Sequence, residues 1–201
     1  MKINSVRALI IAAFSILILS LFGLFLPSIL KKDIQTHYST EAKPGTPFEL
    51  IDSNGNKITE AAFVGFPTVL FFGFTHCPNV CPIALHRLSL LIEKLGEDQN
   101  KLNVYFITLD PERDNWKVLN NYLSVFNSRI IGITGESKKI EALTKSWGVY
   151  SKKVPLDGEN YTIDHTSLIF LLKSDGNFLK TIDFKDDFES SLKEIKKLLK
   201  F

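Results

Sequence analysis

The sequence has little net charge, and this shortage narrows the range of functions. The formal net charge at pH 7 is only +2 over 201 residues, so the chain lacks the broad basic surface that nucleic-acid-binding proteins use. It also contains no internal repeat and no low-complexity tract. With 45% hydrophobic residues, this length suffices for one domain with a core and a short appendage, but not for a second full domain. Nucleic acid is therefore not expected as a partner.

Cysteine is scarce as well, because Cys77 and Cys81 are the only two in the chain. A structural zinc site needs four ligands, and the redox pair of thiol-exchange proteins usually has two intervening residues, whereas this pair has three. Two thiolates suit Cu(I), and an added imidazole nitrogen would let the same site hold Cu(II). A structural disulfide between the two cysteines remains the alternative.

The two cysteines lie between a predicted buried strand and a predicted helix. Residues 67–74 form a continuous apolar run that is typical of a buried strand, and we predict a helix from Pro82, since proline fits the first helical turn. The loop between them would fold over the helix N-terminus. Unpaired amides and the helix dipole at that end favour anionic sulfur. We therefore expect both cysteines to be thiolates.

Strand and helix signals alternate along the rest of the chain, as they do in α/β proteins. Besides the two elements above, the pattern predicts strands at residues 48–52, 102–109, 130–134, 166–172 and 178–184, and helices at residues 116–126, 137–147 and 186–200. The last two strands flank a polar turn and form a hairpin. We expect the globular domain to span residues 44–201.

Residues 8–30 form an uncharged apolar run, which as a helix would span about 34 Å, enough to cross a bilayer. We predict one transmembrane helix here, with residues 1–7 as a short cytoplasmic N-terminus and residues 31–43 as a tether. A cleaved secretory signal is the alternative, but no small-residue cleavage site is found near Pro27. Basic residues flank the run on both sides, so the orientation signal is weak. We expect the domain to face the outer, oxidising side.

Four histidines could supply a nitrogen ligand, and residue patterns alone do not select among them. His37 lies in the tether and is expected to be solvated. His76 adjoins a cysteine, but neighbours at a strand end point to opposite faces, and His86 lies on the helix away from its apolar side. His165 opens the strand predicted at residues 166–172, where a lone histidine is usually structural.

Three segments resemble signature segments of the SCO/SenC family of copper chaperones. They are GFTHCPNVCP (residues 73–82), TLDPERD (residues 108–114) and IDHTSLIFLLKSDG (residues 163–176). Their order and separation match the family too, and the likeness covers about residues 44–200. The resemblance implies a thioredoxin-like fold with an inserted β-hairpin.

The resemblance also implies the site and the role. Copper would be bound by Cys77, Cys81 and His165. Asp110 would lie near the loop that carries the two cysteines, as a supporting or docking group. The alternative for Asp110 is a solvated residue of a turn that ends a strand. The implied role is to deliver copper to the binuclear copper site in subunit II of cytochrome c oxidase, or to reduce its cysteines. The domain would then face the bacterial periplasm or the mitochondrial intermembrane space, and its copper donor is unidentified.

Two classes of function follow from these residues. The first is a metallochaperone, a binding protein whose product is a metal-loaded partner. The second is an enzyme, a membrane-anchored thiol:disulfide oxidoreductase that uses the same cysteines. The third ligand separates them, since thiol exchange has no need of His165. A peroxidase is a more distant option, because thioredoxin-like folds host that activity and a thiolate at Cys77 could attack peroxide.

Overall fold

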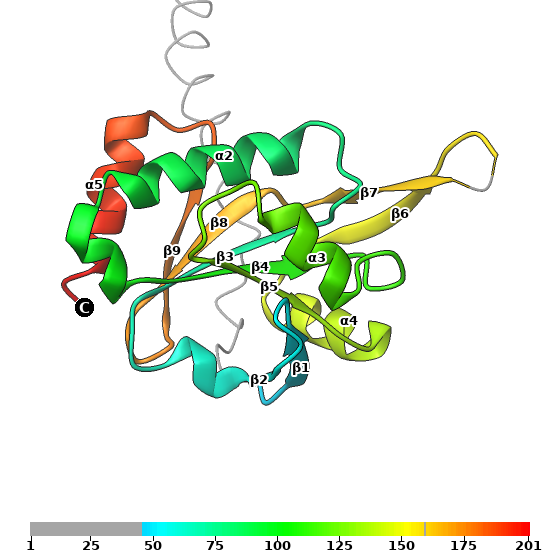
Figure 1. The fold of residues 1–201 in the computed structure, drawn as a ribbon, viewed down its shortest axis with the longest axis horizontal. Coiled ribbons are helices and arrows are strands. Elements are labelled where there is room, and N and C mark those ends of the chain that lie inside the picture. Colours follow the sequence, from blue (N-terminus) through cyan, green and yellow to red (C-terminus); the bar gives the residue numbers. More distant parts are fainter. Residues whose placement is uncertain (1–45, 159) are drawn as a thin grey trace, which may run out of the picture. The chain divides into compact units, whose positions relative to one another are not determined.

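The computed structural model describes residues 46–158 and 160–201 (Figure 1). Its elements are, in chain order, β1 (Glu49–Asp52), β2 (Lys57–Thr59), the 3-10 helix η1 (Glu60–Phe63), β3 (Thr68–Gly73), α2 (Val80–Glu93), the 3-10 helix η2 (Gly96–Lys101), β4 (Asn103–Thr108), α3 (Trp116–Leu123), β5 (Ile130–Thr134), α4 (Ser137–Ser146), β6 (Ser151–Pro155), β7 (Tyr161–His165), β8 (Leu168–Leu172), β9 (Phe178–Asp183) and α5 (Phe188–Leu198). The predicted transmembrane helix, the tether and His37 lie outside the described residues. Among the described helices, none is long and apolar enough to cross a membrane.

A mixed sheet of seven strands forms the centre of the described domain, in the order β2-β1-β5-β4-β3-β8-β9. The neighbours β3, β4 and β5 are parallel, and β1 and β8 join them antiparallel. Every residue of β3 is buried, as expected for a strand covered on both faces. Gly73 at the end of β3 pairs with Thr108 at the end of β4. The loops that follow these two strands therefore leave the sheet side by side, at the edge where α/β proteins build their sites.

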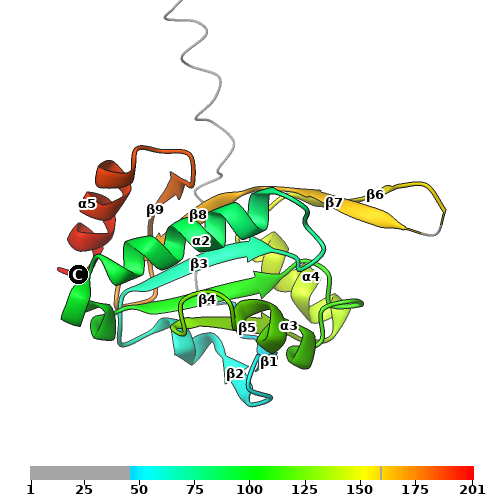
Figure 2. The ribbon, with the colours of Figure 1, turned by 45° about the horizontal axis from the view of Figure 1, so that its top comes forward.

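Helices cover both faces of this sheet (Figures 1 and 2). On one face, the ring of Phe106 from β4 contacts Tyr122 of α3 with centroids 6.1 Å apart. On the other face, Trp147, which follows α4, contacts Phe170 of β8 at 6.0 Å and Phe63 of η1 at 6.4 Å. Because successive strand residues point to opposite faces, the adjacent aromatic residues of β3 and β4 contribute side chains to both layers of the core.

Strands β6 and β7 form a separate two-stranded ribbon that extends beyond the sheet (Figures 1 and 2). Their register runs from Ser151 opposite His165 to Pro155 opposite Tyr161. The ribbon is inserted between α4 and β8, and it is the hairpin that the family resemblance implies. All residues of β6 are exposed, so the apolar pattern that reveals most strands is absent there.

The predicted strands and helices are found within a few residues of their expected bounds, with two corrections at the site. Helix α2 begins at Val80 rather than Pro82, which is its third residue. Amides in the first turn have no intrahelical acceptor, so a residue without an N–H is tolerated anywhere in that turn and need not be the first. His165 ends β7 instead of opening β8, which starts only at Leu168. The residue patterns missed the short strand β2 and the two strands of the ribbon, which only the family resemblance implied.

Candidate metal centre

The loop between β3 and α2 places both cysteine sulfurs at the helix N-terminus. The amide of Cys77 donates to the carbonyl of Phe74 at 3.2 Å, which turns the chain directly after the strand. Asn79, at the N-cap position, makes no side-chain cap hydrogen bond. Instead, the amide of Cys81 donates to Sγ of Cys77 at 3.4 Å. This sulfur therefore accepts a hydrogen bond from an amide of the first helical turn, where amides have no intrahelical acceptor. Both cysteines are free, without a disulfide between them.

His165 approaches the cysteines from the end of β7. Its Nε2 lies 3.8 Å from Sγ of Cys81, and its Nδ1 lies 2.8 Å from the carbonyl oxygen of Thr166. Since a carbonyl only accepts hydrogen bonds, Nδ1 is the donor in this contact, and Nε2 is the nitrogen that faces the sulfurs. The ring also packs edge-on against Phe74, with centroids 5.8 Å apart. These contacts turn the nitrogen that can bind a metal toward the sulfur.

The ligand atoms of Cys77, Cys81 and His165 all lie within 4.8 Å of one another. Cys81 is fully buried, whereas Cys77 and His165 are partly exposed. Two sulfurs and one imidazole nitrogen form a soft donor set of the kind that copper prefers, and three ligands leave room for a further one from outside. The three residues expected to act together are therefore adjacent, with one side of the cluster open to solvent.

The two thiols differ in their protonation, contrary to the expectation that both are thiolates. The pKa of Cys77 is lowered to about 3, chiefly by a hydrogen bond from the Cys81 thiol. Burial opposes this shift, and hydrogen bonds from His165 and from the amides of Cys81 and Asn79 add to it. The same hydrogen bond to Cys77, burial and the negative charge on Cys77 raise the pKa of Cys81 above its ordinary value. Two adjacent anionic sulfurs repel each other, so the metal-free site keeps one proton on Cys81.

Asp110 is fully buried, which rules out the alternative of a solvated turn. Its carboxylate accepts hydrogen bonds from the Tyr161 hydroxyl at 2.7 Å and from the Arg113 guanidinium. A second buried carboxylate, Asp114, was not singled out from the sequence. It accepts hydrogen bonds from the amide of Thr75 at 3.0 Å and from its hydroxyl at 2.5 Å, and another from Thr108 at 2.7 Å. Asp114 thus fixes the start of the loop between β3 and α2, residues 74–79, called the cysteine loop below.

The other described histidines do not join the cluster. His86 lies exposed on α2, as predicted. The His76 side chain is 53% exposed, with Nδ1 3.8 Å from a carboxylate oxygen of Asp114. His76, Asp110 and Asp114 do approach one another within 4.8 Å. Both carboxylates are already engaged, however, by Arg113 and by threonine donors, so this group offers a metal no free anionic ligand.

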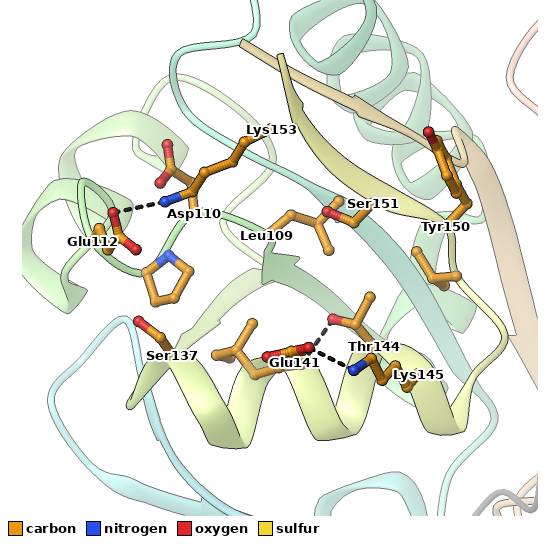
Figure 3. A pocket seen from close by; sticks show the side chains of 13 residues that line it. Leu109, Asp110, Glu112, Ser137, Glu141, Thr144, Lys145, Tyr150, Ser151 and Lys153 are labelled. Atoms are coloured by element: carbon orange, nitrogen blue, oxygen red, sulfur yellow. Dashed lines mark hydrogen bonds and ion pairs between the residues drawn. The ribbon is translucent and has the colours of Figure 1, made fainter. Parts of the chain in front are cut away.

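A pocket of about 430 Å³ lies between α4, β6 and the loop after β4 (Figure 3). None of the three clustered donors lines it. Its walls carry two exposed ion pairs, Lys153 with Glu112 at 2.7 Å and Lys145 with Glu141 at 2.5 Å. Because each cation faces its own anion, the pocket presents no net charge from these pairs to a ligand.

Known proteins similar to this chain share both its sequence and its fold. An SCO2-like protein of Rickettsia prowazekii is 34% identical over 205 residues, covering 100% of this chain and 98% of the relative. The mitochondrial SCO1 homolog 1 of Arabidopsis thaliana is 36% identical over 75% of this chain, which spans only 45% of that relative.

Solved structures resemble the described domain as well. ScoI of Bradyrhizobium japonicum with copper bound is 41% identical, with a TM-score of 0.73 over 77% of this chain and 99% of that one. Yeast Sco1 with copper bound is 33% identical, with a TM-score of 0.71 over 78% of this chain and 88% of that one. The family model described as SCO1/SenC matches residues 36–200. The chain therefore belongs to the SCO1/SenC family and has its mixed α/β, thioredoxin-like fold.

Proposed function

We propose that this chain is a copper metallochaperone that delivers copper to the binuclear copper site of cytochrome c oxidase subunit II during oxidase assembly. The observation that carries this proposal is the convergence of Cys77, Cys81 and His165 within 4.8 Å. Two thiolates satisfy Cu(I), and the imidazole nitrogen extends the site to Cu(II). The copper bound to ScoI of Bradyrhizobium japonicum and to yeast Sco1 supports copper as the metal.

The unequal burial of the donors suits a protein that both takes up and releases its cargo. Cys77 is partly exposed and anionic, so it is the first protein ligand that incoming copper meets. Ligation by Cys81 releases its proton, since a bound cation stabilises the second thiolate. Nε2 of His165 would bind through its lone pair. A partner's thiolate can reach the metal only from the open side near Cys77, where ligand exchange would begin.

We further propose that residues 8–30 anchor the chain as a single-pass membrane protein with the domain on the extracytoplasmic side. The length of the uncharged run supports an anchor. The relatives include a bacterial protein and a mitochondrial one. The domain would thus face the periplasm or, in a mitochondrion, the intermembrane space, where a client exposed on that side of the membrane is within its reach.

A thiol:disulfide oxidoreductase that keeps the subunit II cysteines reduced is the second candidate. The observation that favours it is Cys77, a partly exposed cysteine whose pKa is lowered to about 3. A thiolate next to a buried thiol can attack a disulfide, and the second thiol then resolves the mixed disulfide. His165 is not needed for that exchange, so its conspicuous approach to Cys81 favours the chaperone.

Metal content of the full chain tests the proposal. The reduced protein, offered copper and zinc in competition, is expected to bind one copper per chain, because the described residues hold one such two-sulfur cluster. Cys77→Ser and Cys81→Ser should each abolish tight Cu(I) binding, since one thiolate leaves too few soft donors. The oxidised wild type is the matched control and should bind no Cu(I). Retention of stoichiometric copper by the double serine variant would refute the site.

A further inference from the structure

The loop that follows β4, residues 109–115, contacts both halves of the candidate copper site. At one end, Asp114 accepts hydrogen bonds from the amide and hydroxyl of Thr75, two residues before Cys77. At the other end, Asp110 accepts a hydrogen bond from Tyr161 of β7, the strand that carries His165. The same short segment is therefore bonded to the cysteine loop and to the histidine strand.

Arg113 makes the more extensive of the contacts with β7. Its Nε donates to Asp110, its Nη1 donates to the carbonyl of Tyr161 at 3.1 Å, and its guanidinium lies over the Tyr161 ring, 3.7 Å from the centroid. The Arg113 side chain is 23% exposed and Asp110 is fully buried, so water screens this pair only weakly. A planar guanidinium that stacks and donates in fixed directions restricts both the position and the tilt of its partner.

Alternation along β7 links Tyr161 to the site. Residues Tyr161, Ile163 and His165 share one face of the strand, because side chains at every second position point the same way. Ile163 is 5% exposed and packs in the core. An apolar contact of this kind holds the strand against the domain but has no preferred direction, so by itself it does not fix the tilt of the strand. The directional contacts at Tyr161 supply the missing restraint.

Other links between the ribbon and the loop are weaker. Lys153 of β6 pairs with Glu112 at 2.7 Å (Figure 3), but both side chains are about half exposed, 48% and 56%. Exposed ion pairs contribute little to stability and fix geometry poorly. Of the described contacts between residues 110–114 and the ribbon, those of Arg113 and Asp110 with Tyr161 are part-buried.

We propose that Arg113 is a positioning residue that, through Tyr161 and β7, fixes His165 relative to the two cysteines and thereby sets the affinity of the site for Cu(II). This role rests on the proposed copper function. Cu(I) is satisfied largely by two thiolates, whereas Cu(II) gains more from the nitrogen. Loss of Arg113 should thus weaken Cu(II) binding while the two sulfurs continue to hold Cu(I). Residues that orient metal ligands typically change metal affinity by about 10- to 100-fold when they are replaced.

The test compares wild type with Arg113→Ala in the full reduced chain, using Cu(II) and Cu(I) separately as probes. Arg113→Ala is expected to weaken Cu(II) by about 10- to 100-fold and to reduce the thiolate-to-Cu(II) absorption band, with Cu(I) affinity unchanged. Arg129→Ala is the matched control, because Arg129 donates to exposed Asn100 away from the ribbon. If Arg113→Ala does not fold, Tyr161→Phe removes only the hydroxyl bonded to Asp110, with an expected weakening of about threefold. Unchanged Cu(II) affinity, or an equal loss of both copper ions, would overturn the proposal.

A measurement on the metal-free protein distinguishes an incorrect positioning role for Arg113 from an incorrect copper function. In wild type, the His165 ring lies 5.8 Å from the Phe74 ring, centroid to centroid, which should give nuclear Overhauser effects between their protons. Arg113→Ala should lose these signals and Arg129→Ala should keep them. If wild type bound no copper but the signals behaved as expected, the copper function would fail and the positioning role would stand. Signals that persist in Arg113→Ala would reject the positioning role, whatever the copper result.

Discussion

Gly73, the last residue of β3, lies directly against Cys81 of α2. A Cβ atom on Gly73 would come within 2.7 Å of Sγ of Cys81 and within 2.8 Å of the Phe106 ring, closer than real carbon contacts allow. The missing side chain lets the first turn of α2 approach the strand end. It also leaves the space in which the buried sulfur lies, 3.8 Å from Nε2 of His165.

Gly73→Ala should therefore displace Cys81. We expect it to destabilise the fold by about 1–3 kcal/mol through overpacking and to weaken Cu(I) binding by more than about tenfold, since one of the two thiolates is moved. Urea unfolding and Cu(I) competition measure the two effects. Gly96→Ala is the control: nothing lies within 4 Å of a Cβ there and the strain arises from φ of +58°, so stability should fall while copper binding is kept. Normal copper affinity in Gly73→Ala would contradict this packing argument.

Cys77 should react as a thiolate over an unusually wide pH range. Because its pKa is lowered to about 3, the group is already ionised at pH 5, and its rate of alkylation by iodoacetamide should stay nearly constant from pH 5 to 8 in the reduced, metal-free protein. An ordinary thiol would speed up by about tenfold per pH unit over this range. Mass spectrometry identifies the modified residue.

Cys77→Ser provides the comparison for that experiment. The remaining Cys81 is fully buried and is expected to react slowly with iodoacetamide. A wild-type rate that rises about tenfold per unit between pH 5 and 8 would show an ordinary thiol. In that case the hydrogen bonds from Cys81 and His165 would not stabilise the Cys77 thiolate.

Residues 8–30 should remain in the mature protein. No cleavage site for signal peptidase is found near Pro27, and the run is long enough to span a bilayer. Intact-mass measurement of the membrane-extracted protein checks this expectation. A mature chain that began after Leu30 would mean that the run is a cleaved signal.

Sequence patterns predicted the central elements of this fold because burial leaves a clear signature. The apolar run at residues 67–74 contains β3, and its continuity reflects cover on both faces. The exposed strand β6 has no such signature, since Ser151–Pro155 is stabilised by pairing with β7 and not by burial. The start of α2 was placed two residues late because Pro82 was assigned to the first helical position, although proline fits any position of the first turn.

The site could be predicted only in part from the residues themselves. Cys77 and Cys81 were found because they are the only cysteines, and they lie at a strand-to-helix junction. The approach of His165, 84 residues further along the chain than Cys81, follows from tertiary packing, so no local pattern contains it, and only the family resemblance indicated it. No sequence pattern indicated Asp114 either, because the hydrogen bonds that it accepts from Thr75 and Thr108 form only in the folded domain.

The protonation of the pair was predicted wrongly for a physical reason. A helix N-terminus favours anionic sulfur, but that argument treats each cysteine alone. Once the Cys81 thiol donates to Cys77, the two sulfurs share one negative charge, and burial keeps the proton on Cys81. Coupling of this kind depends on the distance between the groups, which the spacing along the chain does not reveal.

His165→Ala tests whether His165 is a copper ligand on which the chaperone function depends. Three readings are compared with wild type: the thiolate-to-Cu(II) absorption band, Cu(I) affinity by competition, and restoration of oxidase activity in cells that lack the protein. Because Cu(I) is satisfied largely by two thiolates and Cu(II) gains more from nitrogen, Cu(II) binding should weaken far more than Cu(I) binding.

Reduction of a small disulfide by the same variant serves as the control, since Cys77 and Cys81 retain their thiol chemistry. We expect this activity to survive while oxidase activity is not restored. If His165→Ala restored oxidase as well as wild type does, copper ligation by this histidine would not be the function, and the oxidoreductase would replace the chaperone as the explanation of the site.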